Sequence, residues 1–140
     1  RSQTTGNARA VNYNFPPIVR MRNTYFAPGE LSVEEALEEL DTGIYAIGTA
    51  GGQASADGTF MFKARRGYYV EEGEKKHTLR EVTLTGNILT FLKNVEGGTS
   101  ELMIRSGYFG GCGKGGQHPL PVGLGGPHLV VSEVQFGGEK

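Results

Sequence analysis

The chain has 140 residues, a net charge of −1 at pH 7 and 37% hydrophobic residues. That length suits a single domain, which we expect to span residues 1–140 and to bury a core without cross-links. The near-neutral charge implies no bulk attraction to nucleic acid or to a membrane surface, and no apolar run is long enough to cross a bilayer. With one cysteine no internal disulfide can form, so a reducing, cytoplasmic location is the simplest expectation.

Glycine is the compositional anomaly, at 23 of the 140 residues. Average usage is about 7%. The glycines follow no three-residue period, which excludes a collagen-like chain, and they cluster between apolar segments. We therefore expect many tight turns.

The first 29 residues contain four arginines and no acidic residue. They show little periodicity and include Pro16-Pro17, which predicts extended chain with a candidate short strand at 18–22. The first residue is arginine rather than methionine, which suggests a cut or processed piece. We expect residues 1–25 to be loose when the chain is isolated.

A short helix is predicted over residues 33–41. Ser32 and Glu35 form a capping-box pattern, and the apolar residues that follow recur at helical spacing. Gly43 stands where a helix-terminating glycine is expected.

Strands and turns are predicted for most of the remaining chain. We expect a strand at 44–47, a glycine-rich loop at 48–58, a long strand at 59–70, a hairpin connection at 71–74 and a returning strand at 78–85. Asn87 is expected to cap a second short helix that ends at Gly97-Gly98. A strand at 102–104, a glycine-dense stretch at 107–126 and a strand at 127–136 follow. This order of elements predicts a β-rich α+β fold with mostly antiparallel strands and two short helices.

Cys112 is the first candidate for chemistry, because it lies among the glycines of the stretch 110–116. A lone cysteine is most often a small buried hydrophobic residue. Alternatively, the flanking glycines let ligands approach a thiolate that Lys114 would favour, and a thiolate can attack a carbonyl or bind a metal. His118 is the candidate base for a cysteine nucleophile, although no orienting acid is evident.

Two nucleotide-binding patterns fail on their context. Gly111, Gly113 and Gly116 match G-x-G-x-x-G, but the residues that follow include prolines and cannot open a helix. The Gly-Lys pair at 113–114 is followed by glycine rather than serine or threonine, which excludes a Walker loop.

Several strings, in order, resemble the C-terminal domain of the TldD/PmbA family of zinc-dependent peptidases, once labelled modulators of DNA gyrase. They include 6–9, 20–25, 43–45, 51–53, 58–60, 83–86, Cys112-Gly113-Lys114, 121–123 and 125–127. The match spans nearly the whole chain, and the Cys-Gly-Lys string places it on the metal-binding, TldD-like branch. The resemblance implies that this chain is the C-terminal domain of a larger protein.

The resemblance further implies that Cys112 is one zinc ligand, because in that branch an upstream H-E-x-x-x-H helix supplies two histidine ligands and a glutamate base. That motif is absent here, so we expect the chain to hold no catalytic residue and to be inactive alone. The resemblance implies that a flexible peptide binds by strand addition. It also implies a dimer, formed either with a second copy of the protein or with a TldE/PmbA-like sister chain. The residues expected to contact the peptide are Gly51, Gly52, Gln53, Gly111, Gly113, Lys114 and Gln117.

Two alternatives stay open. The chain could instead be a non-catalytic, β-rich assembly module of the PmbA-like branch. It could also belong to a cysteine hydrolase that uses Cys112.

Overall fold

A computed structural model describes residue 3, residues 5–106 and residues 111–139. The chain divides into two compact units: Arg1–Pro28 with Glu101–Pro127, and Gly29–Ser100 with His128–Lys140. Strands make up 50% of the structure and helices 11%, and the ladders between the described strands are antiparallel, which confirms the β-rich α+β prediction. A single domain over residues 1–140 stays a prediction.

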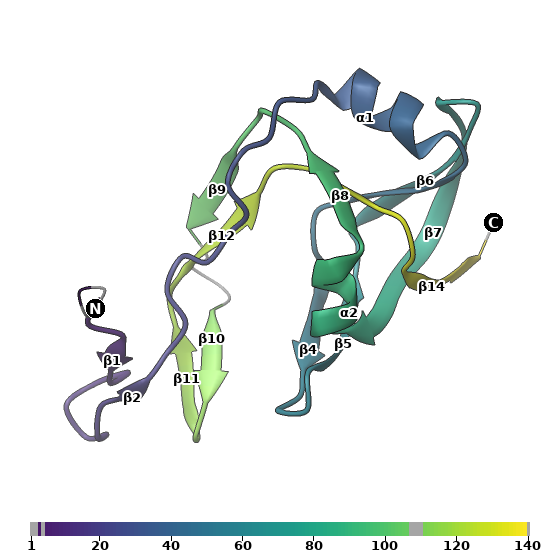
Figure 1. Ribbon diagram of the computed structural model, residues 1–140. Coiled ribbons are helices and arrows are strands. Elements are labelled where there is room, and N and C mark those ends of the chain that lie inside the picture. Colours follow the sequence, from purple (N-terminus) through teal and green to yellow (C-terminus); the bar gives the residue numbers. More distant parts are fainter. Residues whose placement is uncertain (1–2, 4, 107–110, 140) are drawn as a thin grey trace. The chain divides into compact units, whose positions relative to one another are not determined.

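The first unit consists of three separate antiparallel pairs, β1–β2, β9–β12 and β10–β11 (Figure 1). The strands are β1 (Ala8–Arg9), β2 (Ile18–Val19), β9 (Met103–Ser106), β10 (Cys112–Lys114), β11 (Gln117–Leu120) and β12 (Gly123–Gly126). Its buried apolar residues include Leu120 and Val122, and the polar side chains of Arg20 and Gln117 are buried as well. The looseness expected of residues 1–25 stays a prediction.

The second unit is built around one sheet, with two helices and a two-stranded pair beside it (Figure 1). Its elements are α1 (Val33–Leu40), β3 (Gly43–Ile47), β4 (Gly51–Ala54), β5 (Thr59–Lys63), β6 (Arg66–Glu71), β7 (Glu74–Asn87), α2 (Ile88–Lys93), β8 (Val95–Gly98), β13 (Leu129–Val131) and β14 (Gln135–Glu139). Its core includes Leu37, Ala64, Val70, Val82 and Val130.

Helix α1 begins as its sequence predicts. The Glu35 amide donates to the Ser32 hydroxyl at 3.1 Å, and the Ser32 amide donates to the Glu35 carboxylate at 2.8 Å. These reciprocal bonds satisfy two amides that the first turn leaves unpaired. The helix ends at Leu40, one residue before the predicted end. The role predicted for Gly43 was wrong: Asp41, with φ of 53°, caps the helix, and Gly43 already begins β3.

The 14-residue strand β7 organises the sheet, because β5 and β6 pair with successive parts of it and β14 also pairs with it. Lys63 pairs with Thr83 and Gly67 with Leu79, so the two pairs are four positions apart on both strands and the register continues between β5 and β6. The long strand predicted over 59–70 is therefore interrupted without a change of register. The interruption lies opposite Glu81, which has a φ of 52°.

Three other predicted segments differ from the structure. The predicted loop 48–58 contains the strand β4, which pairs with β5. Asn87 caps α2 as predicted, with its side chain accepting from the Leu89 amide at 3.0 Å, but the helix ends at Lys93 and Gly97-Gly98 belong to β8. The predicted strand 127–136 is divided into β13 and the start of β14.

The glycine-dense stretch 107–126 lies outside the described residues at 107–110, and beyond them it forms β10, β11 and β12. The strand predicted at 102–104 is confirmed as β9. In the part of the chain that the structure describes, no helix is long and apolar enough to span a membrane.

The hairpin turn between β6 and β7 provides a test of the fold. Glu71 pairs with Glu74, and the two turn residues Glu72 and Gly73 have φ values of 52° and 71°. This left-handed pair is the two-residue hairpin turn that favours glycine at each position. Glu72 therefore carries a steric cost that Gly73 avoids.

We expect Gly73→Ala to destabilise the second unit by about 1–2 kcal/mol, since the new side chain adopts a left-handed conformation. A Cβ at this position would also lie 3.3 Å from the Glu38 Cα. Glu72→Gly is the matched control and should be neutral or stabilising. Urea unfolding measures both; equal losses of stability in the two variants would contradict this account of the turn.

Candidate functional site

The hairpin β10–β11 brings together five of the residues singled out from the sequence: Gly111, Cys112, Gly113, Lys114 and Gln117. Cys112 pairs with Leu120 and Lys114 with Gln117, with a register shift between the two pairs. Gly111 has a φ of 156°, and a Cβ on it would lie 2.2 Å from the Leu120 carbonyl oxygen. Only glycine fits this position, because any side chain would collide with the Leu120 carbonyl.

Arg20 joins the N-terminal segment to this hairpin. Its guanidinium donates from Nε to the Cys112 sulfur at 3.4 Å, and from Nη2 to the Cys112 carbonyl and, at 3.0 Å, to the Gln117 carbonyl. The side chain is only 2% exposed. A guanidinium that donates to this many acceptors has a fixed orientation. Its position beside the sulfur therefore also determines from which side a ligand can reach the sulfur.

The side chain of Gln117 belongs to the same hydrogen-bond network as Arg20 and Cys112. Its amide oxygen accepts from the Val11 amide at 3.0 Å and from Arg20 Nη1 at 3.4 Å, and its amide nitrogen donates to the Pro16 carbonyl at 2.9 Å. The side chain is 2% exposed. Any contribution of Gln117 to peptide binding therefore acts through Arg20 and the backbone, because its own amide is already used.

The surroundings of Cys112 favour its thiolate. Burial acts to raise the pKa of the Cys112 thiol, but hydrogen bonds from Arg20 and from the Met21 backbone lower it, as do the positive charges of Arg20 and Arg9. The net pKa is below the ordinary value. Lys114, predicted to favour the thiolate, instead donates to the Val19 carbonyl at 3.0 Å.

Cys112 is suited to be one ligand of a metal ion, but the described residues around it do not form a complete metal site. Its sulfur is half-buried and disposed towards the deprotonated form that metals bind. Within the described residues, no group of three histidine, cysteine, aspartate or glutamate side chains is placed to hold a metal ion. A zinc ion bound at Cys112 would therefore need its other protein ligands from elsewhere.

His118 is placed poorly as a base for Cys112. A Cβ on Gly113 would lie 3.0 Å from the His118 ring, so His118 covers the face of the hairpin towards which residue 113 points. Side chains alternate along a strand, so the neighbouring Cys112 points to the opposite face. Gln117, next to His118, also faces Arg20 and the sulfur side. This geometry argues against a Cys112–His118 pair.

The other two histidines have partners in the second unit. The ring of His77 stacks on Tyr69 with centroids 6.3 Å apart, and His128 lies edge-on to Tyr45 at 5.4 Å. Neither contact suggests a metal site.

Gly51, Gly52 and Gln53 form most of strand β4, in the second unit. All four residues of β4 are exposed, and in the described residues this strand pairs with β5 alone. It is thus an edge strand, which leaves a row of main-chain donors and acceptors unpaired.

Sequence reasoning missed Arg20 as a member of the site. The sequence feature that could have indicated Arg20 is the N-terminal segment, which contains arginines but no acidic residue to pair with them. A buried guanidinium needs acceptors, and here they come from residues 92 and 97 positions further along the chain.

Comparison with known proteins places the chain in a family. Residues 1–138 match the model of the PmbA/TldA metallopeptidase C-terminal domain. The chain is 41% identical over 135 residues to a metalloprotease of Synechocystis sp., covering 96% of this chain and 28% of that protein. It is 40% identical over 134 residues to the zinc metalloprotease TldD homolog of Saccharolobus solfataricus, covering 96% and 29%.

Two crystal structures share the fold. TldE from Thermococcus kodakarensis aligns with a TM-score of 0.69 and 19% identity, over 96% of this chain and 28% of that one. A putative modulator of a DNA gyrase from Thermotoga maritima aligns with a TM-score of 0.61 and 26% identity, over 82% and 24%.

The match over residues 1–138 and the fold shared with these structures define the chain as a metallopeptidase C-terminal domain. The chain belongs to the PmbA/TldA metallopeptidase C-terminal domain family. It spans less than a third of the length of the curated relatives described above.

We expect Arg20→Met to raise the pKa of Cys112, because it removes both a hydrogen bond to the sulfur and a positive charge. Below the ordinary thiol pKa, the variant should carry less thiolate and react more slowly with iodoacetamide, whereas the rates should converge at strongly alkaline pH. Alkylation rates of the metal-free chain across pH measure this.

Arg22→Met is the control, since Arg22 is exposed and donates to the Thr5 carbonyl. Its pH profile should match that of the unmodified chain. Identical profiles for all three proteins would show that Arg20 does not act on the thiol.

Proposed function

We propose that this chain is the C-terminal part of a TldD-like zinc-dependent peptidase, in which it supplies Cys112 as one zinc ligand and part of the peptide-binding cleft. The observation that carries the proposal is the half-buried Cys112 sulfur, which Arg20 both orients and polarises. The naming of a relative at 40% identity as a zinc metalloprotease supports the metal.

The chain's own residues have a positioning role in this reaction. Arg20 holds the sulfur in one direction, and Gln117 holds Arg20. A zinc ion, when bound, would lower the pKa of a water molecule and polarise a peptide carbonyl. Because the sequence contains no H-E-x-x-x-H motif, we propose that the remaining ligands and the general base come from the rest of a longer protein and that this chain is inactive alone.

The peptide is proposed to bind through its main chain. The exposed edge of β4, with Gly51, Gly52 and Gln53, can accept an extended peptide as a further strand. Gly111, Gly113 and Lys114 lie beside Cys112 in the chain, and we propose that they contact the peptide near the metal through their main-chain groups. This mode favours flexible, unfolded peptides, because a folded substrate has no free strand to add.

Partnership and location are further parts of the proposal. The similarity of fold to TldE is consistent with pairing between this protein and either a second copy or a TldE/PmbA-like sister chain. The alternative reading, a non-catalytic assembly module of the PmbA-like branch, predicts the same fold but no role for the Cys112 sulfur in metal binding. A cytoplasmic location is proposed from the single, unpaired cysteine.

The zinc content of the longer protein distinguishes a TldD-like peptidase from a non-catalytic assembly module of the PmbA-like branch. In the longer protein that contains this chain, Cys112→Ser should remove about one zinc per chain and abolish peptidase activity, because a hydroxyl is a far poorer zinc ligand than a thiolate. Elemental analysis and a peptide-hydrolysis assay measure the two losses.

His118→Ala is the matched control, from the other face of the same hairpin, and should leave zinc and activity unchanged. Unchanged zinc in Cys112→Ser would exclude Cys112 as a ligand and favour the assembly module. Activity that withstands chelation but is lost in His118→Ala would instead identify a cysteine hydrolase.

A further inference from the structure

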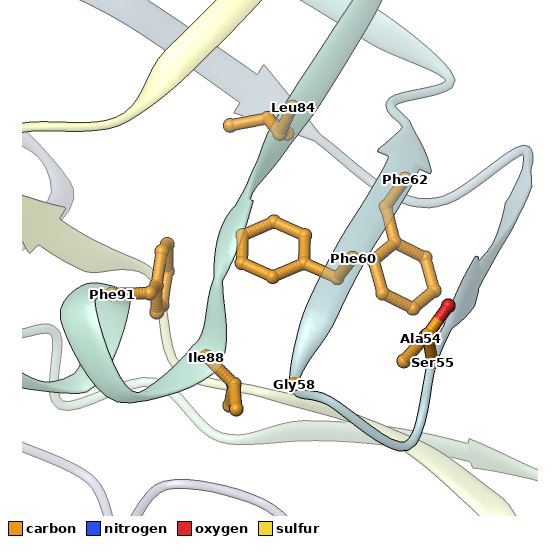
Figure 2. Close-up of a pocket in the computed structure, with 8 residues that line it drawn as sticks. All are labelled: Ala54, Ser55, Gly58, Phe60, Phe62, Leu84, Ile88 and Phe91. Carbon is orange, nitrogen blue, oxygen red and sulfur yellow. The ribbon is translucent and has the colours of Figure 1, made fainter.

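An apolar pocket of about 400 Å³ opens on the sheet of the second unit (Figure 2). Its lining includes Phe60 and Phe62 from β5 and Leu84 from β7, with Ile88 and Phe91 from α2 on one side. Ala54 and Ser55 form the opposite side, at the end of β4. The pocket is open to solvent, since Phe62 is 39% exposed and Ile88 44%.

The strand register explains why these side chains meet on one face. Ala54 pairs with Phe60, and Phe62 pairs with Leu84, and paired residues of an antiparallel ladder share a face. Phe60 is itself opposite Gly86, where a Cβ would lie 3.3 Å from the phenyl ring. The glycine therefore makes room for the ring, which meets Phe91 edge-on with centroids 5.8 Å apart.

The pocket reaches the free edge of the sheet at Ala54. The Ser55 amide donates to the Thr59 carbonyl at 2.8 Å, which marks these two residues as a hydrogen-bonded pair. Hydrogen-bonded and non-hydrogen-bonded pairs alternate along an antiparallel ladder. The main-chain groups of Gly52 and Ala54 therefore point away from β5, towards the unpaired edge.

An extended chain added to this edge would bond to Gly52 and Ala54. Its residue opposite Ala54 would have its side chain on the same face as Ala54, about 4.5–5.5 Å away between Cβ atoms. That is the face on which the pocket lies. The unpaired main-chain groups and the pocket are thus arranged for one ligand: an extended peptide with a suitable side chain at this position.

We infer that this pocket is a subsite for a large apolar side chain of a peptide that adds to β4. The inference rests on the proposed function for its peptide ligand and adds a preference among peptides. The lining excludes a charged side chain, because Ser55 alone contributes a polar side-chain group to it and burial of an unpaired charge is unfavourable. The volume and the aromatic walls suit phenylalanine, leucine or a residue of similar size.

The test measures binding of two peptides to the 140-residue chain, without metal and without turnover. The probes are fluorescein-labelled Thr-Ser-Phe-Ser-Thr and Thr-Ser-Ala-Ser-Thr, and fluorescence anisotropy gives their dissociation constants. The phenylalanine peptide should bind at least about tenfold more tightly, as expected for burial of one aromatic side chain.

Two variants in the same turn of α2 test whether the preference for the phenylalanine peptide comes from the pocket. Ile88→Lys places a charge in the pocket lining and should bring the ratio of the two dissociation constants close to one. Leu89→Lys is the matched control: Leu89 is 66% exposed and is not among the lining residues, so the ratio should be kept. Circular dichroism of both variants checks that the fold is retained.

Three results would overturn the inference. Equal affinity for the two peptides in the unmodified chain would exclude the pocket but leave strand addition intact. Absence of binding by both would also remove the strand-addition part of the proposed function, while the zinc experiment would still test the role of Cys112. Self-association of the chain that Ile88→Lys abolishes, measured by sedimentation equilibrium, would show that a second copy occupies the pocket.

Discussion

The buried guanidinium of Arg20 is the constraint on which the first unit depends. Removing a charge from water costs several kcal/mol unless partners replace the lost hydration. In the part of the chain that the structure describes, no carboxylate lies within ion-pair distance of Arg20. Its partners are carbonyls, an amide oxygen and the sulfur of Cys112. The Cys112 sulfur, when deprotonated, would be the negative charge best placed to balance Arg20, so the packing of this unit and the protonation of Cys112 are linked.

This link gives the N-terminal segment a role in the site. Gln117 bonds to Val11 and Pro16 as well as to Arg20, so residues about one hundred positions apart share one polar network. A metal ligand that accepts a hydrogen bond from a fixed donor is held in orientation and has its electron density reduced. The network thus acts on both the direction and the charge of the sulfur.

The features predicted correctly from the sequence are those that nearby residues determine. The capping box at Ser32, the cap at Asn87 and the hairpin at 71–74 each depend on fewer than five residues. Strand β4 was missed because its glycines have low strand propensity, and its conformation comes from pairing with β5. Arg20 was missed for a similar reason, since its acceptors lie far along the chain. Cys112 was singled out by its glycine-rich surroundings, but the proposal that it is a metal ligand came from the family resemblance.

The two units differ in what each can do without further residues. A zinc ion needs at least three protein ligands for a stable catalytic site, and one thiolate supplies only a fraction of that affinity. An edge strand and an apolar pocket need no such completion, because main-chain bonds and burial of a side chain act locally. In the proposed function, peptide binding and peptide hydrolysis are therefore separable on physical grounds: binding would depend on the edge strand and the pocket of this chain, and hydrolysis on further metal ligands from the longer protein. On this proposal, the chain would bind and select a peptide independently of the metal-bound water that would hydrolyse it.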